Sequence, residues 1–100
     1  MIVEPVHCNL VVIRSRNLDR AEQFYRALGL SLTRHAHGKG PTHLTSASSG
    51  HVFEIYPLED EARSTAATRI GFAVSSVDDT YAALLNSGGK SVSGPKDSEW

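Results

Sequence analysis

"HVFEIYPL", residues 51–58, places one carboxylate, Glu54, inside an otherwise apolar run. The run follows a Ser-Ser-Gly turn signal and precedes a polar segment, and this pattern predicts a β-strand. Successive side chains of a strand point to opposite faces. Phe53 and Ile55 are therefore expected to pack under a helix, which leaves Glu54 and Tyr56 on the second face of the sheet.

A complete βαβββ pattern surrounds this run. Three earlier segments have the composition of β-strands: residues 8–13, 30–35 and 42–47. Between the first two, apolar residues recur on one face of a predicted helix: Leu18, Ala21, Phe24, Tyr25 and Leu28. Asn17 is a suitable N-cap for this helix, and Gly29 is suited to end it. The sequence therefore predicts a module over residues 1–58.

The second half of the chain repeats the start of this module. "NLDRAEQFYRALG" and "SVDDTYAALLNSG" share a polar cap, an Asp, an aromatic residue, a Leu and a closing Gly. The repeat follows a predicted strand at residues 69–74, and a further short strand is expected at residues 90–93. We therefore expect a linker at residues 59–68 and a partial second module at residues 69–100.

Composition limits the classes of function. The chain has 100 residues, 40% hydrophobic and 21% charged, with a net charge of -1; this indicates one globular domain without a field that attracts nucleic acid or membranes. Cys8 is the only cysteine, which excludes an intrachain disulfide and a thiolate metal site, and it is expected to lie on a buried strand. With no signal peptide and no membrane-length apolar run, a cytoplasmic location is expected.

Three stretches together resemble a known family: "HCNLVVIRSRNLDRAEQFYRALGL", "HVFEIYPL" and "TRIGFAVSSVDDTYAALLNSGG". They cover nearly the whole chain and are similar to the vicinal oxygen chelate superfamily. That group includes glyoxalase I, bleomycin-resistance proteins, fosfomycin-resistance proteins and extradiol dioxygenases. The resemblance implies an α+β fold in which paired βαβββ modules form a curved mixed sheet around a cleft, here with the second module incomplete.

The resemblance also implies candidate metal ligands. Metal-dependent relatives hold a divalent ion with His and Glu side chains on strands, and such ligands suit Ni, Zn, Fe or Mn. Glu54 matches the ligand position on the fourth strand, and His7 is the only candidate on the opening strand. However, eleven residues separate His7 from Leu18, more than the family spacing, which would select Leu10. The sequence leaves open whether His7 stays in register.

Arg69 occupies the position of the third ligand, and the fourth would lie beyond Trp100. A guanidinium does not bind metal, but it can bind a carboxylate or phosphate at two points. Arg69 and Tyr56 are therefore candidate substrate-binding residues, although Arg69 could also pair with Glu54. A further histidine pair, His35 and His37, lies beside turn signals and is interpreted as the tip of a hairpin, with a gating loop or an adventitious metal site as alternatives.

Two functions follow from the resemblance. One is a metal-dependent enzyme, of the lyase, isomerase or dioxygenase type, that acts on a small oxygen-rich substrate; Glu54 favours it. The other is a metal-free protein of the bleomycin-resistance type that binds or sequesters a small molecule; Arg69 favours it. A third alternative is a dimer-forming remnant without a ligand. An incomplete second module would leave a sheet edge exposed, so a homodimer that closes the cleft is expected.

Overall fold

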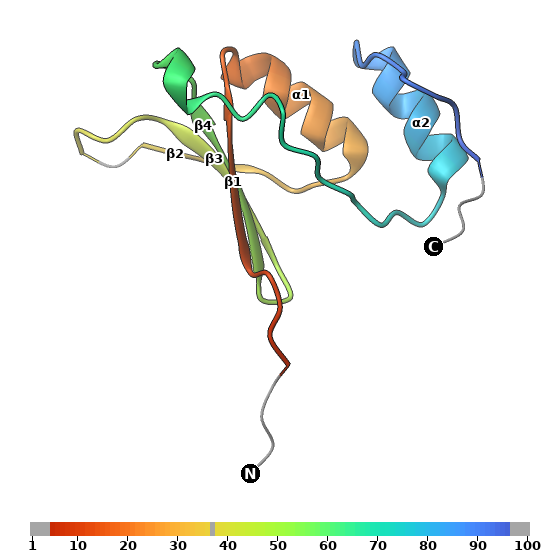
Figure 1. Cartoon of the computed structure of the whole chain (residues 1–100), viewed down its shortest axis with the longest axis horizontal. Helices are drawn as coiled ribbons and strands as arrows, with labels where there is room; N and C mark the ends of the chain where they lie inside the picture. Colours follow the sequence, from red (N-terminus) through yellow and green to blue (C-terminus); the bar gives the residue numbers. More distant parts are fainter. Residues whose placement is uncertain (1–4, 37, 97–100) are drawn as a thin grey trace.

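A computed structural model describes residues 5–36 and 38–96 of the chain. These residues form a four-stranded sheet, two α-helices and one short 3-10 helix (Figure 1). The elements are, in chain order, β1 (Leu10–Ser15), α1 (Leu18–Leu28), β2 (Thr33–His35), β3 (His43–Ser48), β4 (His51–Pro57), η1 (Glu61–Arg63) and α2 (Val77–Asn86). The α+β class expected from the sequence is confirmed, and so is the βαβββ order of the first module.

The strands lie in the order β1-β4-β3-β2. β1 pairs with β4 in parallel, while β3 is antiparallel to both β4 and β2. The parallel pair requires a crossover, which α1 and the β2–β3 hairpin supply. β3 and β4 are joined by a tight turn in which Ser49 and Gly50 have φ values of 50° and 81°. Two positive φ values in sequence are typical of a type I′ hairpin turn, whose twist matches that of the flanking strands.

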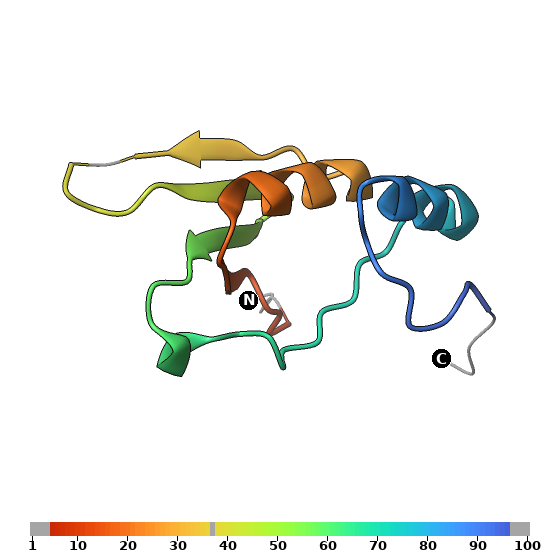
Figure 2. The same ribbon diagram turned by 90° about the horizontal axis from the view of Figure 1, so that it is seen from above.

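The hydrophobic core lies between the sheet and α1. Four residues of the described chain form the buried cluster: Leu32, Leu44, Phe53 and Ile55. The Tyr25 ring of α1 packs on the Phe53 ring with a centroid distance of 5.1 Å. Both helices lie on this side of the sheet, and α2 packs against α1 (Figures 1 and 2). We call the opposite side of the sheet the outer face.

The ends of α1 follow the sequence signals. The side chain of Asn17 accepts a hydrogen bond from the backbone N–H of Arg20, as an N-cap does. Gly29 has φ 117°, a left-handed conformation that closes the helix, and its N–H donates to Arg26 and Tyr25 carbonyls. The expected bounds of this helix are therefore confirmed.

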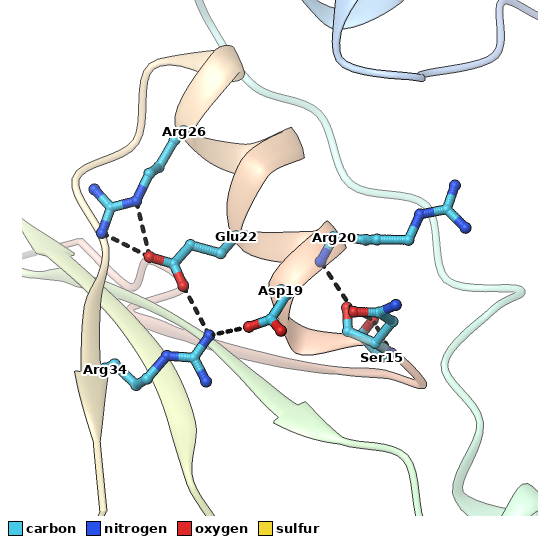
Figure 3. Close-up of polar contacts among 7 residues, drawn as sticks. Ser15, Asp19, Arg20, Glu22, Arg26 and Arg34 are labelled. Atoms are coloured by element: carbon cyan, nitrogen blue, oxygen red, sulfur yellow. Dashed lines mark hydrogen bonds and ion pairs between the residues drawn. The ribbon is translucent and has the colours of Figure 1, made fainter.

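Ion pairs connect α1 to β2 across the rim of the core (Figure 3). The Arg34 guanidinium of β2 lies 2.8 Å from carboxylate oxygens of both Asp19 and Glu22. Arg26 lies 2.9 Å from Glu22 and also donates to the Leu32 carbonyl. Arg34 first, and then Arg26, lower the pKa of Glu22 by hydrogen bonding to its carboxylate. The short strand β2 is thus held to α1 by ion pairs, and it is held to β3 by backbone hydrogen bonds.

Several expected strand boundaries are wrong. β1 begins at Leu10 rather than at Cys8, and Cys8 is exposed rather than buried. The expected strand at residues 69–74 is an extended segment without strand pairing, and residues 90–93 also form no strand. A strand needs a hydrogen-bonded neighbour for its backbone groups, and neither segment is paired with a strand of the described residues. We call residues 69–74 the unpaired segment.

The β3–β4 turn yields a stability prediction. Ser49→Asn should raise the free energy of unfolding by a few tenths of a kcal/mol, because Asn tolerates the left-handed conformation. Ser49→Val should lower it by roughly 1–2 kcal/mol, because a β-branched side chain is strained there. Urea titration measures both changes in the free energy of unfolding. Ser93→Val is the control, because Ser93 is also exposed but does not have a positive φ. Equal effects of the two valines would contradict the assigned turn.

The ion pairs of Glu22 predict a dependence of stability on pH. The folded state lowers the pKa of Glu22 below its ordinary value of 4.5, so the stabilisation is complete above that value and is lost as pH falls through the lowered pKa. Wild type should therefore have a higher urea midpoint than Glu22→Gln at pH 7, and the difference should vanish in strong acid. Glu59→Gln is the control. A difference that persists or grows in acid would contradict the pairing.

Candidate functional site

The outer face carries a ladder of polar and aromatic side chains that crosses the whole sheet. Each strand contributes one residue, in the spatial order Arg14 (β1), Tyr56 (β4), His43 (β3) and His35 (β2). The strand register causes this alignment, because Arg14 is opposite Tyr56 and His35 is opposite His43. We call these four residues the outer-face ladder.

The ladder is a continuous stack. The His43 and Tyr56 rings are nearly parallel, with an interplanar angle of 4° and a centroid distance of 4.3 Å. His35 stacks on His43 at 5.5 Å, and the Arg14 guanidinium carbon lies 5.6 Å from the Tyr56 centroid. His43 is only 9% exposed because its neighbours cover it.

Glu54 lies in the next row of the outer face. Its carboxylate accepts a hydrogen bond of 3.0 Å from the Thr45 hydroxyl, and His43 Nε2 lies 3.5 Å from the same oxygen. Thr45 is directly opposite Glu54 in the β3–β4 register, so the hairpin brings the two side chains together. The predicted placement of Glu54 and Tyr56 on the face opposite Phe53 is confirmed by these contacts and by the pairing.

Beyond Glu54 the outer face becomes apolar along β1. Val12 is opposite Glu54, and Leu10 is opposite Val52. Leu10 and Val12 are 53% and 39% exposed, which is high for large aliphatic side chains on a strand. The outer face therefore changes from cationic and aromatic at Arg14 to aliphatic at Leu10.

The other two sequence-predicted site residues lie away from this network. His7 precedes β1, where its ring packs edge-on against His51 and its Nδ1 lies 3.3 Å from the Pro5 carbonyl. Arg69 opens the unpaired segment, which crosses the core side of the sheet and packs Phe72 against Phe53. The contacts described for His7 and Arg69 do not involve Glu54, so their roles at a shared site stay predictions.

The described side chains do not fit a metal site. Among residues 5–36 and 38–96, no three His, Cys, Asp or Glu side chains are grouped so that they could hold a metal ion. Glu54 and His43 alone would supply a carboxylate and an imidazole, and both already interact with each other. A protein metal site generally uses three or four such ligands. The described residues therefore supply only part of a metal-ligand set.

His43, Thr45 and Arg14 were not among the site residues predicted from the sequence. The signal was present in the Ser49-Gly50 turn, because a two-residue turn pairs Ser48 with His51 and so determines every later pair. Counting outward from the turn places Thr45 beside Glu54 and His43 beside Tyr56. Arg14 was harder to assign, since its position depends on the parallel pairing of β1 with β4.

Comparison with known proteins agrees with this architecture. Residues 6–100 match the family model of the Glyoxalase/Bleomycin resistance protein/Dioxygenase superfamily. The chain belongs to this superfamily. The resemblance derived from the sequence motifs is thereby confirmed over nearly the full length. None of the curated protein sequences matches the chain.

Two solved structures share the fold of this superfamily member. A hypothetical protein from S. aureus, SA1046, has 18% sequence identity and a TM-score of 0.70; the match covers 94% of this chain and 80% of that protein. An integron cassette protein from the mobile metagenome of V. cholerae, VCH_CASS1, has 17% identity and a TM-score of 0.55, with 96% and 78% covered. At these identities the likeness concerns the fold alone.

Proposed function

We propose that this superfamily member binds a small molecule on the outer face without a metal, as a binding or sequestering protein. The observation that supports the proposal is the ladder, which places Arg14, Tyr56 and His43 side by side on a sheet face that neither helix covers. Aromatic and cationic side chains that converge on an apolar surface are typical of ligand sites. Tyr56 is then a contact residue, as the sequence predicted.

The state of Glu54 supports a metal-free site. Its carboxylate is held by Thr45 and His43, and Arg69 takes the place of a third ligand in the sequence pattern. A second candidate, the metal-dependent enzyme, is favoured by the 3.5 Å separation of His43 Nε2 and Glu54. The His43 imidazole and the Glu54 carboxylate form a partial ligand set for Ni, Zn, Fe or Mn. His7 is the additional metal ligand that the sequence predicts.

Metal content tests the choice between these functions. Purified protein, incubated separately with Ni, Zn, Fe(II) and Mn and then desalted, should contain well below one ion per chain by elemental analysis. Glu54→Ala and His7→Ala should not change that content. One tightly held ion per chain that is lost in Glu54→Ala would overturn the metal-free proposal in favour of the enzyme. An ion lost only in His7→Ala would also overturn it and place the site at the start of β1.

The proposed binding unit is a homodimer. In the proposed division, a module at residues 1–58 is followed by a linker at 59–68 and a partial module at 69–100, and the unpaired segment of that partial module has no paired strand among the described residues. Its Ile70 and Phe72 side chains are 36% and 37% exposed. A cavity of about 570 Å³ lies between this segment and the sheet, and its wall includes Val11 and Phe53.

The dimensions of the chain also support association. The radius of gyration is 15.4 Å, whereas a compact 100-residue domain has about 13 Å. An extended apolar segment with free backbone groups is a typical site for pairing with another strand. In the proposed homodimer, the second copy pairs with the unpaired segment on the core side, and it extends past the β1 edge of the sheet to form the second wall of the ligand site on the outer face.

The remaining expectations concern membranes, nucleic acid and cellular location. No described helix is long and apolar enough to cross a membrane. We propose no nucleic-acid or membrane partner for this protein. A cytoplasmic location stays a prediction from the sequence.

The dimer proposal predicts a mass of about twice 10.8 kDa by light scattering. Ile70→Ser should shift the protein toward the monomer, because it removes exposed apolar area from the unpaired segment. Val92→Ser is a matched control, since Val92 is fully exposed and lies outside that segment. A wild-type monomer at micromolar concentration, or equal effects of both variants, would contradict the proposed interface.

A further inference from the structure

The charges on the outer face are not evenly compensated. Glu54 has a hydroxyl donor in Thr45 and an imidazole in His43. Arg14 has only neutral partners among the described residues: its guanidinium donates to the Pro57 carbonyl at 3.4 Å and lies over the Tyr56 ring. A permanent cation without a carboxylate partner therefore stands at the β1 end of the ladder, and Arg remains charged at every physiological pH.

Ring orientation makes the same end of the face favourable for an anion. The Tyr56 ring lies between the Arg14 guanidinium and the His43 ring, and the edge of an aromatic ring carries the positive part of its quadrupole. A planar guanidinium also matches a carboxylate at two points. The ladder therefore presents an anion-binding end next to Arg14.

An apolar path leads away from Arg14 along β1. Val12 and Leu10 follow at every second residue on the same face, with Val52 beside Leu10. Four residues of a strand span about 13 Å. Glu54 is directly opposite Val12 on β4, but its carboxylate accepts a hydrogen bond from Thr45 on β3, the strand on the side away from β1, so a chain that follows β1 need not cover it.

We propose that the ligand of the outer face is an amphiphilic anion, most simply a medium-chain or aryl-alkyl carboxylate. Its carboxylate binds Arg14 beside the edge of Tyr56, and its apolar body lies along Val12 and Leu10. This inference rests on the proposed binding function, and it adds the chemical class and the orientation of the ligand. Charge complementarity at Arg14 and the exposed aliphatic row carry the two parts of the assignment.

Octanoate tests the proposal, with 1-octanol and acetate as probes that lack one half of the ligand. The full-length ¹⁵N-labelled protein is titrated with each probe and followed by backbone chemical shifts. Octanoate should bind saturably and shift residues of β1 and β4, whereas octanol and acetate should bind at least about 10-fold more weakly, since each loses either the charged contact or the apolar one.

Variants separate the two halves of the site. Arg14→Gln should weaken octanoate binding about 10-fold or more and leave octanol unchanged, because only the carboxylate contact is lost. Arg14→Lys should recover part of the affinity, since it restores the charge without the planar guanidinium. Val12→Ser should weaken both probes. Lys90→Gln is the control, because Lys90 is an exposed cation that follows α2 and lies outside the sheet.

The outcomes distinguish this inference from the function on which it rests. If octanol binds the outer face as tightly as octanoate, or if Arg14→Gln and Lys90→Gln behave alike, the anion assignment is overturned while small-molecule binding on this face stands. If octanoate shifts only residues of the core side, the outer face is the wrong site. If no probe binds the dimer, the assigned ligand class is overturned, and a screen of cationic and neutral polar ligands then tests the binding function separately.

Discussion

β4 is hydrogen-bonded on both edges, to β1 in parallel and to β3 in the antiparallel sense. Its register therefore determines which side chains of its neighbours share a face with Glu54 and which share a face with Phe53. A shift by one residue would turn Glu54 into the core and expose Phe53. The apolar cluster under α1 opposes such a shift, because burial of Phe53 and Ile55 depends on the observed register.

This constraint also explains why core and candidate site lie back to back. Along β3 and β4, every second residue packs beneath α1. The residues between them point to the outer face, where they form the ladder and the contacts of Glu54. The same hairpin turn that pairs Ser46 with Phe53 in the core pairs Thr45 with Glu54 outside. Arg34 of β2 points toward α1 and pairs there with Asp19 and Glu22, whereas His35, the next residue, joins the ladder.

The first module was largely predictable from local chemistry. Apolar periodicity identified α1, Asn17 and Gly29 identified its ends, and strand alternation assigned Glu54 and Tyr56 to one face. These features depend on near neighbours in the sequence, so local rules suffice. The same rules failed for the unpaired segment: "RIGFAV" has the composition of a strand, but strand formation depends on a partner that composition does not describe.

The sequence by itself determined the βαβββ order, the superfamily and the face of the sheet on which the one acidic residue of β4 lies, because each follows from the order and spacing of residues. Only the tertiary structure decided which side chains surround that residue. His43 reaches Glu54 through the β3–β4 hairpin, and Arg14 reaches the neighbouring outer-face residue Tyr56 through the parallel pairing of β1 with β4. Strand pairing, rather than residue type, is the physical reason that Glu54 lies beside Thr45 and His43 and not beside Arg69.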